Sequence, residues 1–493
     1  MSSAIPFSNS YVKLPARFYS QLSPTPVAAP GPIRVNRVLA RELGLDPDWL
    51  ASPEGTQVLA GNTVPEGAAP LAAVYAGHQF GSFNPQLGDG RAILLGELVD
   101  SSGRQVDLQL KGAGRTPWSR GGDGRSPLGP VLREYIVSEA MAALGVPTTR
   151  ALAAVSTGEQ VFRDRALPGA VLARMAGSHV RIGTFEYFAA RKDTEALQTL
   201  VDFTLQRHYP ERGDSDNAAL ALLEEAIARQ ASLIPQWQLL GFIHGVMNTD
   251  NTLLSGETID YGPCAFMDAF DPETVFSSID QGGRYAYCNQ PAIAHWNLAC
   301  LAQALVPVLH DEPEQAVALA QAAVDRFGEL YLDSHSRGLR AKLGLDSEQA
   351  TDNSLIEDLY TLMAAEASDF TLTFRHLADL ADSAGAAGQD IAELQPLPAS
   401  FEPWLARWQA RLAAEPLDPA ERQRRMYRAN PVFIPRNHLV EEAIAAATDS
   451  DDFGPFHRLV ERLAEPFTYT PTDQRYALPP EPGERVYQTF CGT

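Results

Sequence analysis

The chain has 493 residues, of which 45% are hydrophobic and 20% are charged, as is usual for a soluble globular protein with more than one lobe. Its 61 acidic and 39 basic side chains give a net charge of −22, which argues against nucleic acid or an anionic membrane as the main partner. No apolar run approaches the roughly 20 residues that span a bilayer, and the first residues lack the pattern of a signal peptide. We therefore expect a cytoplasmic, monomeric protein with no membrane and no nucleic-acid partner.

The first part of the chain divides into two regions by pattern. Residues 1–70 are rich in Pro and Ala, contain one helical stretch at 34–43, and are expected to form an extension that wraps the body of the protein. Residues 71–190 favour strands and turns, and the alternating segments 91–99 and 105–111 predict a β-hairpin around an Asp-Ser-Ser-Gly turn. The second region is therefore expected to be a β-rich small lobe.

The remainder of the chain, residues 191–493, is dominated by helical spacing. Apolar residues recur with helical period and with suitable end signals over 217–242, 313–332, 353–366, 403–414 and 439–448. The sequence thus predicts an α+β protein in which a large helical lobe follows the β-rich small lobe.

Two motifs at the start of the helical region suggest nucleotide chemistry. The first is His244-Gly-Val-Met-Asn-Thr-Asp-Asn, and the second is Asp260-Tyr-Gly. Protein kinases place a His, an Asp two residues later as base, an Asn that binds metal, and then the metal-binding Asp of Asp-Phe-Gly in this order. Overlaying the pattern puts Asn251 and Asp260 on the metal ligands, for Mg²⁺ or Mn²⁺, and puts Val246 on the base. An isopropyl group accepts no proton, so the usual kinase base is missing.

Two segments of the small lobe have the character of phosphate ligands. Gly88-Asp-Gly-Arg91 precedes a strand, where glycines let backbone N–H groups approach phosphate and a guanidinium can grip its oxygens. Lys111 ends the second strand of the hairpin, and the helix predicted over 130–144 carries Glu134 and Glu139. These two carboxylates point to different helix faces, so one of them meets Lys111, and spacing alone does not decide which. A structural turn and a surface lysine are the alternatives.

The segment between Lys111 and that helix, residues 112–126, is dense in Gly and Arg. Arg115, Arg120 and Arg125 in an otherwise acidic protein suggest an anionic ligand, whereas a mobile surface loop is the simpler alternative.

Five segments together resemble one known family. The segments LGDGRAILLGE, LQLKGAGRTPWSRGGDGRSPLG, HGVMNTDNTL, IDYGPCAFMDAF and DQGGRYAYCNQP are similar to the selenoprotein O family, also called SelO or YdiU. The resemblance covers most of the chain and is strongest over 75–301. It implies a bilobal, protein-kinase-like fold that transfers AMP, rather than phosphate, from ATP to Ser, Thr or Tyr hydroxyls of proteins, the enzyme itself included.

The resemblance also implies roles for particular residues. It selects Glu134 as the partner of Lys111, Asp250 as the catalytic base, and Asn251 with Asp260 as metal ligands. The implied ATP-binding residues are Gly88, Gly90, Arg91, Lys111, Asp123, Gly124, Arg174, Arg181 and Asp260. If the additional cations hold the β- and γ-phosphates inside, the α-phosphate faces the acceptor and pyrophosphate leaves.

The four cysteines show no zinc spacing and no disulfide framework. Cys491 stands where some members of the family carry selenocysteine, which implies a redox switch with a second cysteine. The matching partner position is Phe276 here, so Cys264 and Cys288 are substitutes, and unreactive thiols are the alternative.

Three other functions remain to be weighed against AMP transfer. Transfer of UMP from UTP with Mn²⁺ is a variant that the sequence does not distinguish. A conventional kinase is disfavoured by Val246. An inactive nucleotide-binding pseudokinase scaffold is disfavoured because Lys111, Asn251 and Asp260 are all retained.

Overall fold

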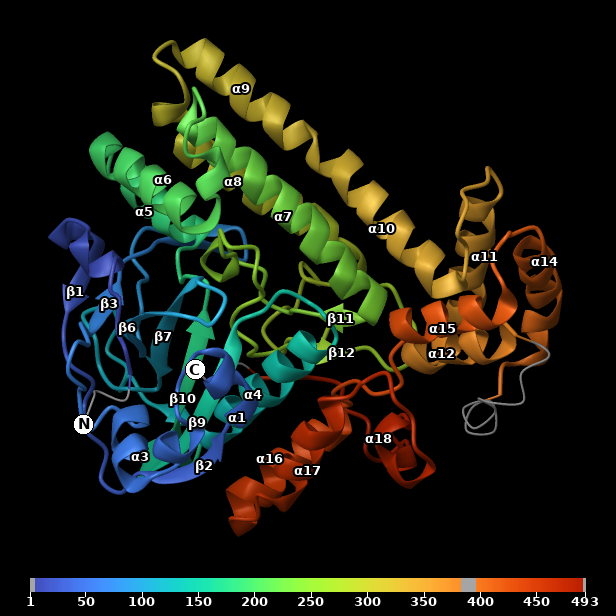
Figure 1. Cartoon of the computed structure of the whole chain (residues 1–493), viewed down its shortest axis with the longest axis horizontal. Coiled ribbons are helices and arrows are strands. Elements are labelled where there is room, and N and C mark those ends of the chain that lie inside the picture. Colours follow the sequence, from blue (N-terminus) through green and yellow to red (C-terminus); the bar gives the residue numbers. More distant parts are fainter. Residues whose placement is uncertain (1–4, 383–395, 491–493) are drawn as a thin grey trace.

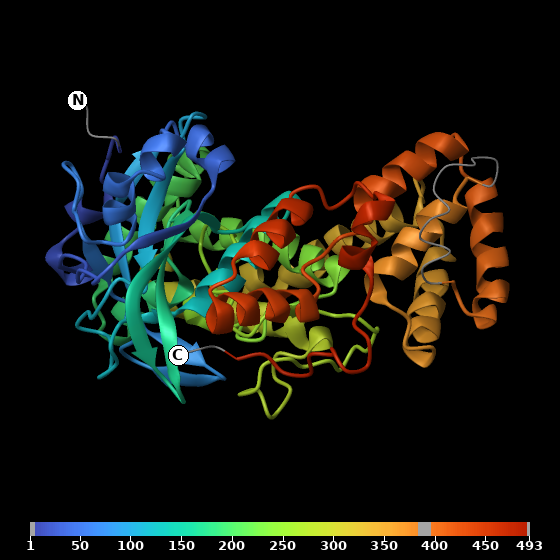
Figure 2. The same cartoon turned by 90° about the horizontal axis from the view of Figure 1, so that it is seen from below.

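A computed structural model describes residues 5–382 and 396–490 of the chain. Figure 1 shows a twisted sheet with short covering helices on one side and long helices that make up the rest of the molecule. Seen from below, the molecule is elongated, with the sheet at one end and the helices of residues 352–429 at the other (Figure 2). The protein is therefore a mixed α+β structure with a β-sheet lobe and a helical lobe, as predicted.

An antiparallel eight-stranded sheet forms the β-sheet lobe. Its strands follow the order β1-β3-β6-β7-β10-β9-β2, and β8 pairs with β10 beside this path. Two small sheets, β4–β5 and β11–β12, lie outside it. The strands are β1 Tyr19–Gln21, β2 Gly31–Val35, β3 Leu71–Ala73, β4 Gly77–Gln79, β5 Ser82–Asn84, β6 Ala92–Val99, β7 Gln105–Lys111, β8 Ser126–Pro127, β9 Arg150–Phe162, β10 Ala166–Ala176, β11 Phe242–Ile243 and β12 Ala265–Phe266.

The predicted hairpin is confirmed as β6 and β7, which pair from Ala92↔Lys111 to Val99↔Gln105. Seven of the eight residues of β6 are buried because both faces of the sheet are covered, which explains its nearly continuous apolar sequence. The hairpin therefore places Lys111 at the end of a strand in the middle of the sheet.

Different helices cover the two faces of the sheet. The short helices α1 (Arg37–Glu42), α2 (Pro47–Leu50) and α3 (Pro53–Leu59) share one apolar cluster with residues of β6, β7, β9 and β10. Helix α4 (Leu128–Ala143) packs on the opposite face, against β9 and β10. The expected helix over 130–144 is confirmed as α4.

The expected helix over 34–43 is wrong at its start. Residues 31–35 form β2, which pairs with β9, and the helix begins only at Arg37. Asn36 separates the two elements, because its side chain accepts a hydrogen bond from the Leu39 N–H and so caps α1.

The helical lobe contains most of the remaining chain. Its helices are α5 Ile182–Ala190, α6 Thr194–His208, α7 Ala218–Leu240, α8 Gln290–Leu309, α9 Pro313–Asp325, α10 Phe327–Leu343, α11 Asp352–Ala365, α12 Phe370–Leu380, α14 Glu402–Ala413, α15 Pro419–Ala429, α16 Asn437–Ser450, α17 Gly454–Leu463 and α18 Gln474–Ala477. The predicted helices 217–242, 353–366, 403–414 and 439–448 are confirmed as α7, α11, α14 and α16. The segment 313–332 was predicted as one helix, but a break at Arg326 divides it between α9 and α10, and α10 continues to Leu343.

One described segment, Tyr287–Leu309, is long and apolar enough to cross a bilayer by length and composition. Its helix α8 packs against α5, α7 and α9, which is the setting of a core helix. Helices α16 and α17 return to α4 and pack on its outer side (Figure 1).

Candidate active site

A cavity of about 660 Å³ opens where β6, β7 and β10 face the segment 246–262. It is lined by each residue to which the sequence assigned ATP, metal or catalysis, namely Gly88, Gly90, Arg91, Lys111, Asp123, Gly124, Arg174, Arg181, Asp250, Asn251 and Asp260. Among the residues that line it, seven are basic (Arg91, Lys111, Arg120, Arg125, Arg163, Arg174 and Arg181) and four are acidic (Asp89, Asp123, Asp250 and Asp260). The cavity therefore reverses the charge balance of the whole chain.

Strand register brings two of these cations together. Arg174 on β10 lies opposite Gln109 on β7, and Gln109 precedes Lys111 by two residues, so both cations share one face of the sheet. Helix α4 presents Glu134 to this face. Lys111 Nζ donates to Glu134 Oε2 at 2.6 Å, and Arg174 Nη1 donates to Glu134 Oε1 at 2.9 Å. The other candidate partner, Glu139, is paired instead with Arg150 at 2.8 Å.

Asp260 joins this network from the opposite side of the cavity. Its Oδ1 accepts hydrogen bonds from Lys111 Nζ at 2.6 Å and from Arg174 Nη1 at 2.7 Å, and Arg181 Nη1 lies 3.5 Å from its Oδ2. Burial alone would raise the pKa of Asp260, but the three cations hold it well below its usual value. Asp260 is therefore ionised throughout the physiological range.

Hydrogen bonds and packing hold the segment 244–251, of which Val246, Asp250 and Asn251 line the cavity. His244 is fully buried, its ring stacks on Trp237 at 5.3 Å, and its Nε2 lies 2.9 Å from the Ile259 carbonyl. Burial lowers the pKa of His244, so the ring is neutral and serves the packing of the loop. Asn251 Nδ2 donates to the Val246 carbonyl at 2.9 Å. Because its amide nitrogen is used in this way, the oxygen of Asn251 is the atom left for a ligand.

Asp250 follows Val246 by four residues, and both line the cavity. It is 7% exposed, its Oδ2 accepts a hydrogen bond from Gln79 Nε2 at 3.0 Å, and its buried Oδ1 has no hydrogen-bond partner. Burial raises the pKa of Asp250 to about 6. The group is thus ionised at neutral pH, with a pKa close to the value at which a general base works best.

The glycines at the mouth of the cavity are required by close packing. Gly88 has φ +73°, and a Cβ there would lie 2.4 Å from Trp118 Cγ; a Cβ on Gly90 would lie 2.9 Å from the Trp118 carbonyl oxygen. Gly124 has φ +71°, and a Cβ on it would lie 2.1 Å from the carbonyl oxygen of Gly114. A side chain at any of these positions would therefore require Trp118 or the backbone of the insert to move.

The arginine-rich insert is more strongly structured than its composition suggests. Arg115 Nε donates to the Gly122 carbonyl at 2.7 Å, and Arg125 Nη1 donates to the Thr25 carbonyl at 3.0 Å. Arg163 on the β9–β10 turn forms an ion pair of 2.8 Å with Asp123. Arg115 thus fixes the backbone of the insert itself, Arg125 joins the insert to the segment at Thr25, and Arg163 joins it to the β9–β10 turn.

Sequence reasoning missed several residues that line the cavity. Gln79 and Phe80 come from the β4–β5 hairpin, Trp118 from the insert, and Tyr75 from the loop before β4, where the Arg181 guanidinium lies 4.4 Å from the centre of its ring. Gln79 is adjacent to a Phe-Gly turn, which signals a hairpin but carries no sign of chemistry. Only the tertiary contact with Asp250 shows its place in the site.

The segment after Asp260 is held by residues near position 490. Thr489 Oγ1 donates to the Pro263 carbonyl at 2.6 Å, and the Thr489 N–H donates to the Phe276 carbonyl at 2.8 Å. Cys491 lies outside the described residues, so the redox switch stays a prediction. No disulfide joins any two cysteines within 5–382 and 396–490.

The fold and the cavity define the class of protein: an α+β protein with a cavity lined mainly by cations, between its sheet and the segment 246–262. The family model described as "Protein adenylyltransferase SelO" matches residues 2–464. A protein of Rhodopseudomonas palustris strain BisB5 is 59% identical over 493 residues, and one of Bradyrhizobium sp. strain ORS 278 is 58% identical over 496 residues, with full coverage of both chains in each case. Both relatives are named "Protein nucleotidyltransferase YdiU".

The chain therefore belongs to the SelO family, which confirms the resemblance drawn from its motifs. It is an enzyme of the nucleotidyltransferase class.

Proposed function

We propose that this protein transfers AMP from ATP to Ser, Thr or Tyr hydroxyls of proteins, itself included, and releases pyrophosphate. The charge of the cavity carries the proposal, because seven basic and four acidic side chains line it in a chain that is acidic overall. Val246 supports transfer of AMP rather than phosphate, since the position of the kinase base has no proton acceptor. The setting we propose is a cytoplasmic monomer that acts on protein acceptors, without nucleic acid or membrane.

A kinase-like fold is part of the proposal. In protein kinases a strand lysine pairs with a glutamate of the following helix, and a catalytic loop with Asn precedes the metal-binding Asp. Lys111 at the end of β7, Glu134 on α4, Asn251 and Asp260 follow this order, and the Lys111–Glu134 distance of 2.6 Å corresponds to the kinase ion pair.

The cations of the cavity would hold the phosphates of ATP. Arg174 and Arg181 are 2% exposed and are fixed by neighbouring acceptors, so they offer charge that needs little reorganisation during the reaction. With Arg91 and Lys111 they would bind the β- and γ-phosphates, which leaves the α-phosphate towards the acceptor. The backbone at Gly88, Gly90, Asp123 and Gly124 would close around the nucleotide.

Asn251 and Asp260 fit a divalent metal ion. Oxygen ligands are the donors that Mg²⁺ and Mn²⁺ prefer, and the Asn251 oxygen remains available because its nitrogen binds the Val246 carbonyl. Mg²⁺ or Mn²⁺ bound there would neutralise charge on the phosphates. The negative charge of Asp260, which its low pKa maintains, suits this role.

Asp250 would act as the general base. In the proposed step the acceptor oxygen forms a bond to the α-phosphorus while its proton moves to the Asp250 carboxylate. The bond from the α-phosphorus to the bridging oxygen breaks, and pyrophosphate leaves with that electron pair. The Gln79 amide already holds one oxygen of Asp250, which fixes the orientation of the carboxylate before the acceptor arrives.

The test uses ATP labelled at either the α- or the γ-phosphate, with a protein acceptor and Mg²⁺ or Mn²⁺. We expect α-label, and no γ-label, on the acceptor and on the enzyme itself. Transfer of γ-label would establish a kinase with an unconventional base, and transfer of neither label would indicate a scaffold. A parallel reaction with α-labelled UTP and Mn²⁺ decides between AMP and UMP, since the faster reaction at equal nucleotide concentration identifies the donor.

A further inference from the structure

Three consecutive contacts join the β4–β5 hairpin to residues 248–250, which belong to the segment 244–251 and are called the catalytic loop below. The His78 N–H donates to Thr249 Oγ1 at 2.7 Å, Gln79 Nε2 donates to Asp250 Oδ2 at 3.0 Å, and the Phe80 N–H donates to Asn248 Oδ1 at 3.1 Å. Three consecutive residues of the hairpin thus contact three consecutive residues of the loop, 248–250.

The tip of the hairpin has an unusual backbone that allows these contacts. Phe80 has φ +51° and Gly81 has φ +81°, which are the paired positive values of a tight two-residue hairpin turn. A phenylalanine in this region is uncommon and must be held by its surroundings. The ring of Phe80 packs on Tyr285 at 5.0 Å, and the Tyr285 hydroxyl donates to Asn248 Oδ1 at 2.6 Å.

Glu186 of α5 contacts both Thr249 and His78, so that the three residues form a ring of hydrogen bonds. Its Oε2 accepts from Thr249 Oγ1 at 2.5 Å, and its Oε1 lies 2.5 Å from His78 Nδ1. Since the Thr249 hydroxyl also accepts from the His78 N–H, the three residues form a closed cycle. Glu186 and Thr249 are buried, which makes each broken bond costly.

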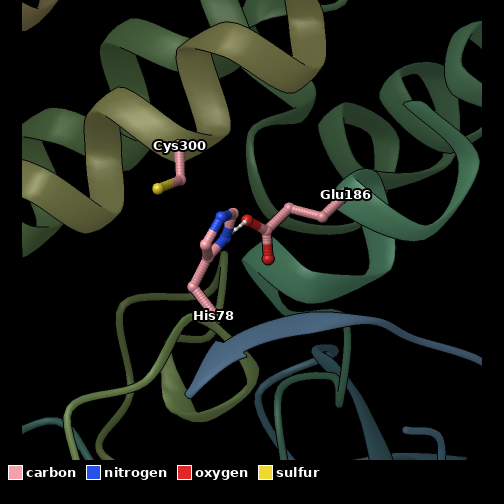
Figure 3. Close-up of side chains that lie close together, drawn as sticks. All are labelled: His78, Glu186 and Cys300. Atoms are coloured by element: carbon pink, nitrogen blue, oxygen red, sulfur yellow. Dashed lines mark hydrogen bonds and ion pairs between the residues drawn. The ribbon is translucent and has the colours of Figure 1, made fainter. Parts of the chain in front are cut away.

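Cys300 of α8 completes a cluster that could also be considered as a metal site (Figure 3). One ligand atom from each of His78, Glu186 and Cys300 lies within 4.8 Å of the others. However, both oxygens of Glu186 and the Nδ1 of His78 are already used in the hydrogen-bonded cycle. In the metal-free protein, burial raises the pKa of the Cys300 thiol to about 12. The contacts therefore favour a positioning device over a metal centre.

We infer that Glu186 and Thr249 are positioning residues for nucleotide transfer, which they support by fixing the β4–β5 hairpin so that the Gln79 amide orients Asp250. This inference rests on the proposed function, because it gives Asp250 the role of base. Because the cycle of hydrogen bonds fixes His78, the next residue along β4, Gln79, is placed with its side-chain amide against Asp250. A Cβ on Gly77 would lie 2.6 Å from Asp250 Oδ1, so only glycine at this position lets the strand approach the carboxylate this closely.

The central comparison is between Thr249→Val and Thr249→Ser. Valine has the shape of threonine but breaks both hydrogen bonds of the hydroxyl, whereas serine keeps them. Because small misplacements of a catalytic group can cost about 100-fold in rate, we expect Thr249→Val to lower kcat by roughly 10- to 100-fold. The Kd for ATP should change by less than about threefold, and Thr249→Ser should recover most of kcat. Gln79→Leu, which removes the amide at Asp250, should reproduce the loss of kcat and serves as second variant if Thr249→Val does not fold.

Metal analysis of the purified protein and a Cys300→Ala variant complete the experiment. We expect no stoichiometric zinc and an unchanged kcat in Cys300→Ala. If the wild type contains stoichiometric zinc, and Cys300→Ala loses both the zinc and the activity, the cluster is a metal site and the positioning role is refuted. Equal kcat in wild type, Thr249→Val and Gln79→Leu, or an equal loss of ATP affinity and kcat, would overturn the inference alone. A wild type that transfers neither AMP nor UMP would instead refute the proposed function, and the inference with it.

Discussion

Replacement of Asp260 by Asn tests the charge network of the cavity most directly. The change keeps the size of the side chain but removes the negative charge that lies within 2.6 to 3.5 Å of Lys111, Arg174 and Arg181. Asn is preferable to Ala, because Asp260 has φ +65°, a conformation that Asn adopts readily and Ala does not. The effect therefore reports charge and not backbone strain.

The structure sets the size of the expected effect on stability. Removal of one partner from a buried ion pair typically costs about 3–5 kcal/mol. Glu134 still pairs with Lys111 and Arg174 in the variant, and the Asp260 side chain is 22% exposed, so we expect a smaller loss of about 2 kcal/mol. An unfolding entropy near 2.1 cal/mol/K per residue gives about 1 kcal/mol/K for a cooperative chain of this size, so Tm should fall by about 2 °C.

The pH dependence of this loss has a definite sign. The folded-state pKa of Asp260 lies below its unfolded value, so the stabilisation is present in full above the unfolded pKa of about 3.9. It disappears as the pH falls through the folded pKa. The difference in stability between wild type and Asp260→Asn should therefore be constant from pH 5 to 8 and shrink below about pH 4.

Calorimetric melting with and without ATP and Mg²⁺ measures both effects. At a ligand concentration of 100 times Kd, binding should stabilise the wild type by about 2.7 kcal/mol, and Asp260→Asn should lose most of this increment together with transfer activity. Asp271→Asn is the matched control, because Asp271 is exposed and its side chain only accepts a hydrogen bond from the Glu273 N–H. An Asp260→Asn protein with unchanged Tm and the full ligand-induced increment would refute the proposed network.

Three further predictions concern single residues. Asp250→Asn should lower kcat by about 10²- to 10⁴-fold with little change in ATP affinity. The wild-type rate should fall below about pH 6, because this carboxylate is then protonated. Steady-state kinetics that show mainly a loss of ATP binding would make Asp250 a binding residue. Burial lowers the pKa of Lys342 to about 7, so between pH 7 and the unfolded pKa of about 10.4 the native state binds fewer protons than the unfolded state and wild-type stability rises with pH. The free energy of unfolding of Lys342→Met should therefore exceed that of wild type by about 2 kcal/mol at pH 7, after allowance for the contact of Lys342 with the Phe374 ring. This difference should shrink towards pH 10. Denaturation curves that differ by the same amount at all pH values would contradict the prediction. Gly88→Ala should weaken ATP binding by at least tenfold in a titration, because its Cβ displaces Trp118, and an unchanged Kd would show that this turn does not approach the nucleotide.

The sequence predicted those site residues whose positions follow from nearby residues in the chain. Lys111 ends a strand with a clear alternating pattern, and Asn251 and Asp260 stand at fixed offsets within two motifs. Such positions follow from local backbone geometry and from spacing, so they are readable in one chain. The choice of Glu134 over Glu139 required the resemblance to the family, because helix periodicity places both residues near the sheet without ranking them.

Contacts between distant segments account for what the sequence did not predict. Gln79 meets Asp250 across 171 positions, and the strand at 31–35 forms because it pairs with β9. Composition also does not show which arginines are already bound: Arg115 donates to the Gly122 carbonyl within the insert, and Arg125 donates to the Thr25 carbonyl. Local propensity contains none of this information, since the partner is supplied by the tertiary structure.

The bonds from Thr489 to the segment after Asp260 have a consequence for synthesis of the protein. Thr489 supports the Pro263 carbonyl across 226 positions of the chain, so a growing polypeptide contains Asp250 and Asp260 long before it contains their support. At a translation rate of about 5–20 residues per second, this interval lasts on the order of 10 to 45 seconds. During that time the Pro263 carbonyl, which follows the cavity residue Gly262, lacks its hydrogen bond from Thr489. We therefore expect the segment after Asp260 to reach its final position only near the end of synthesis.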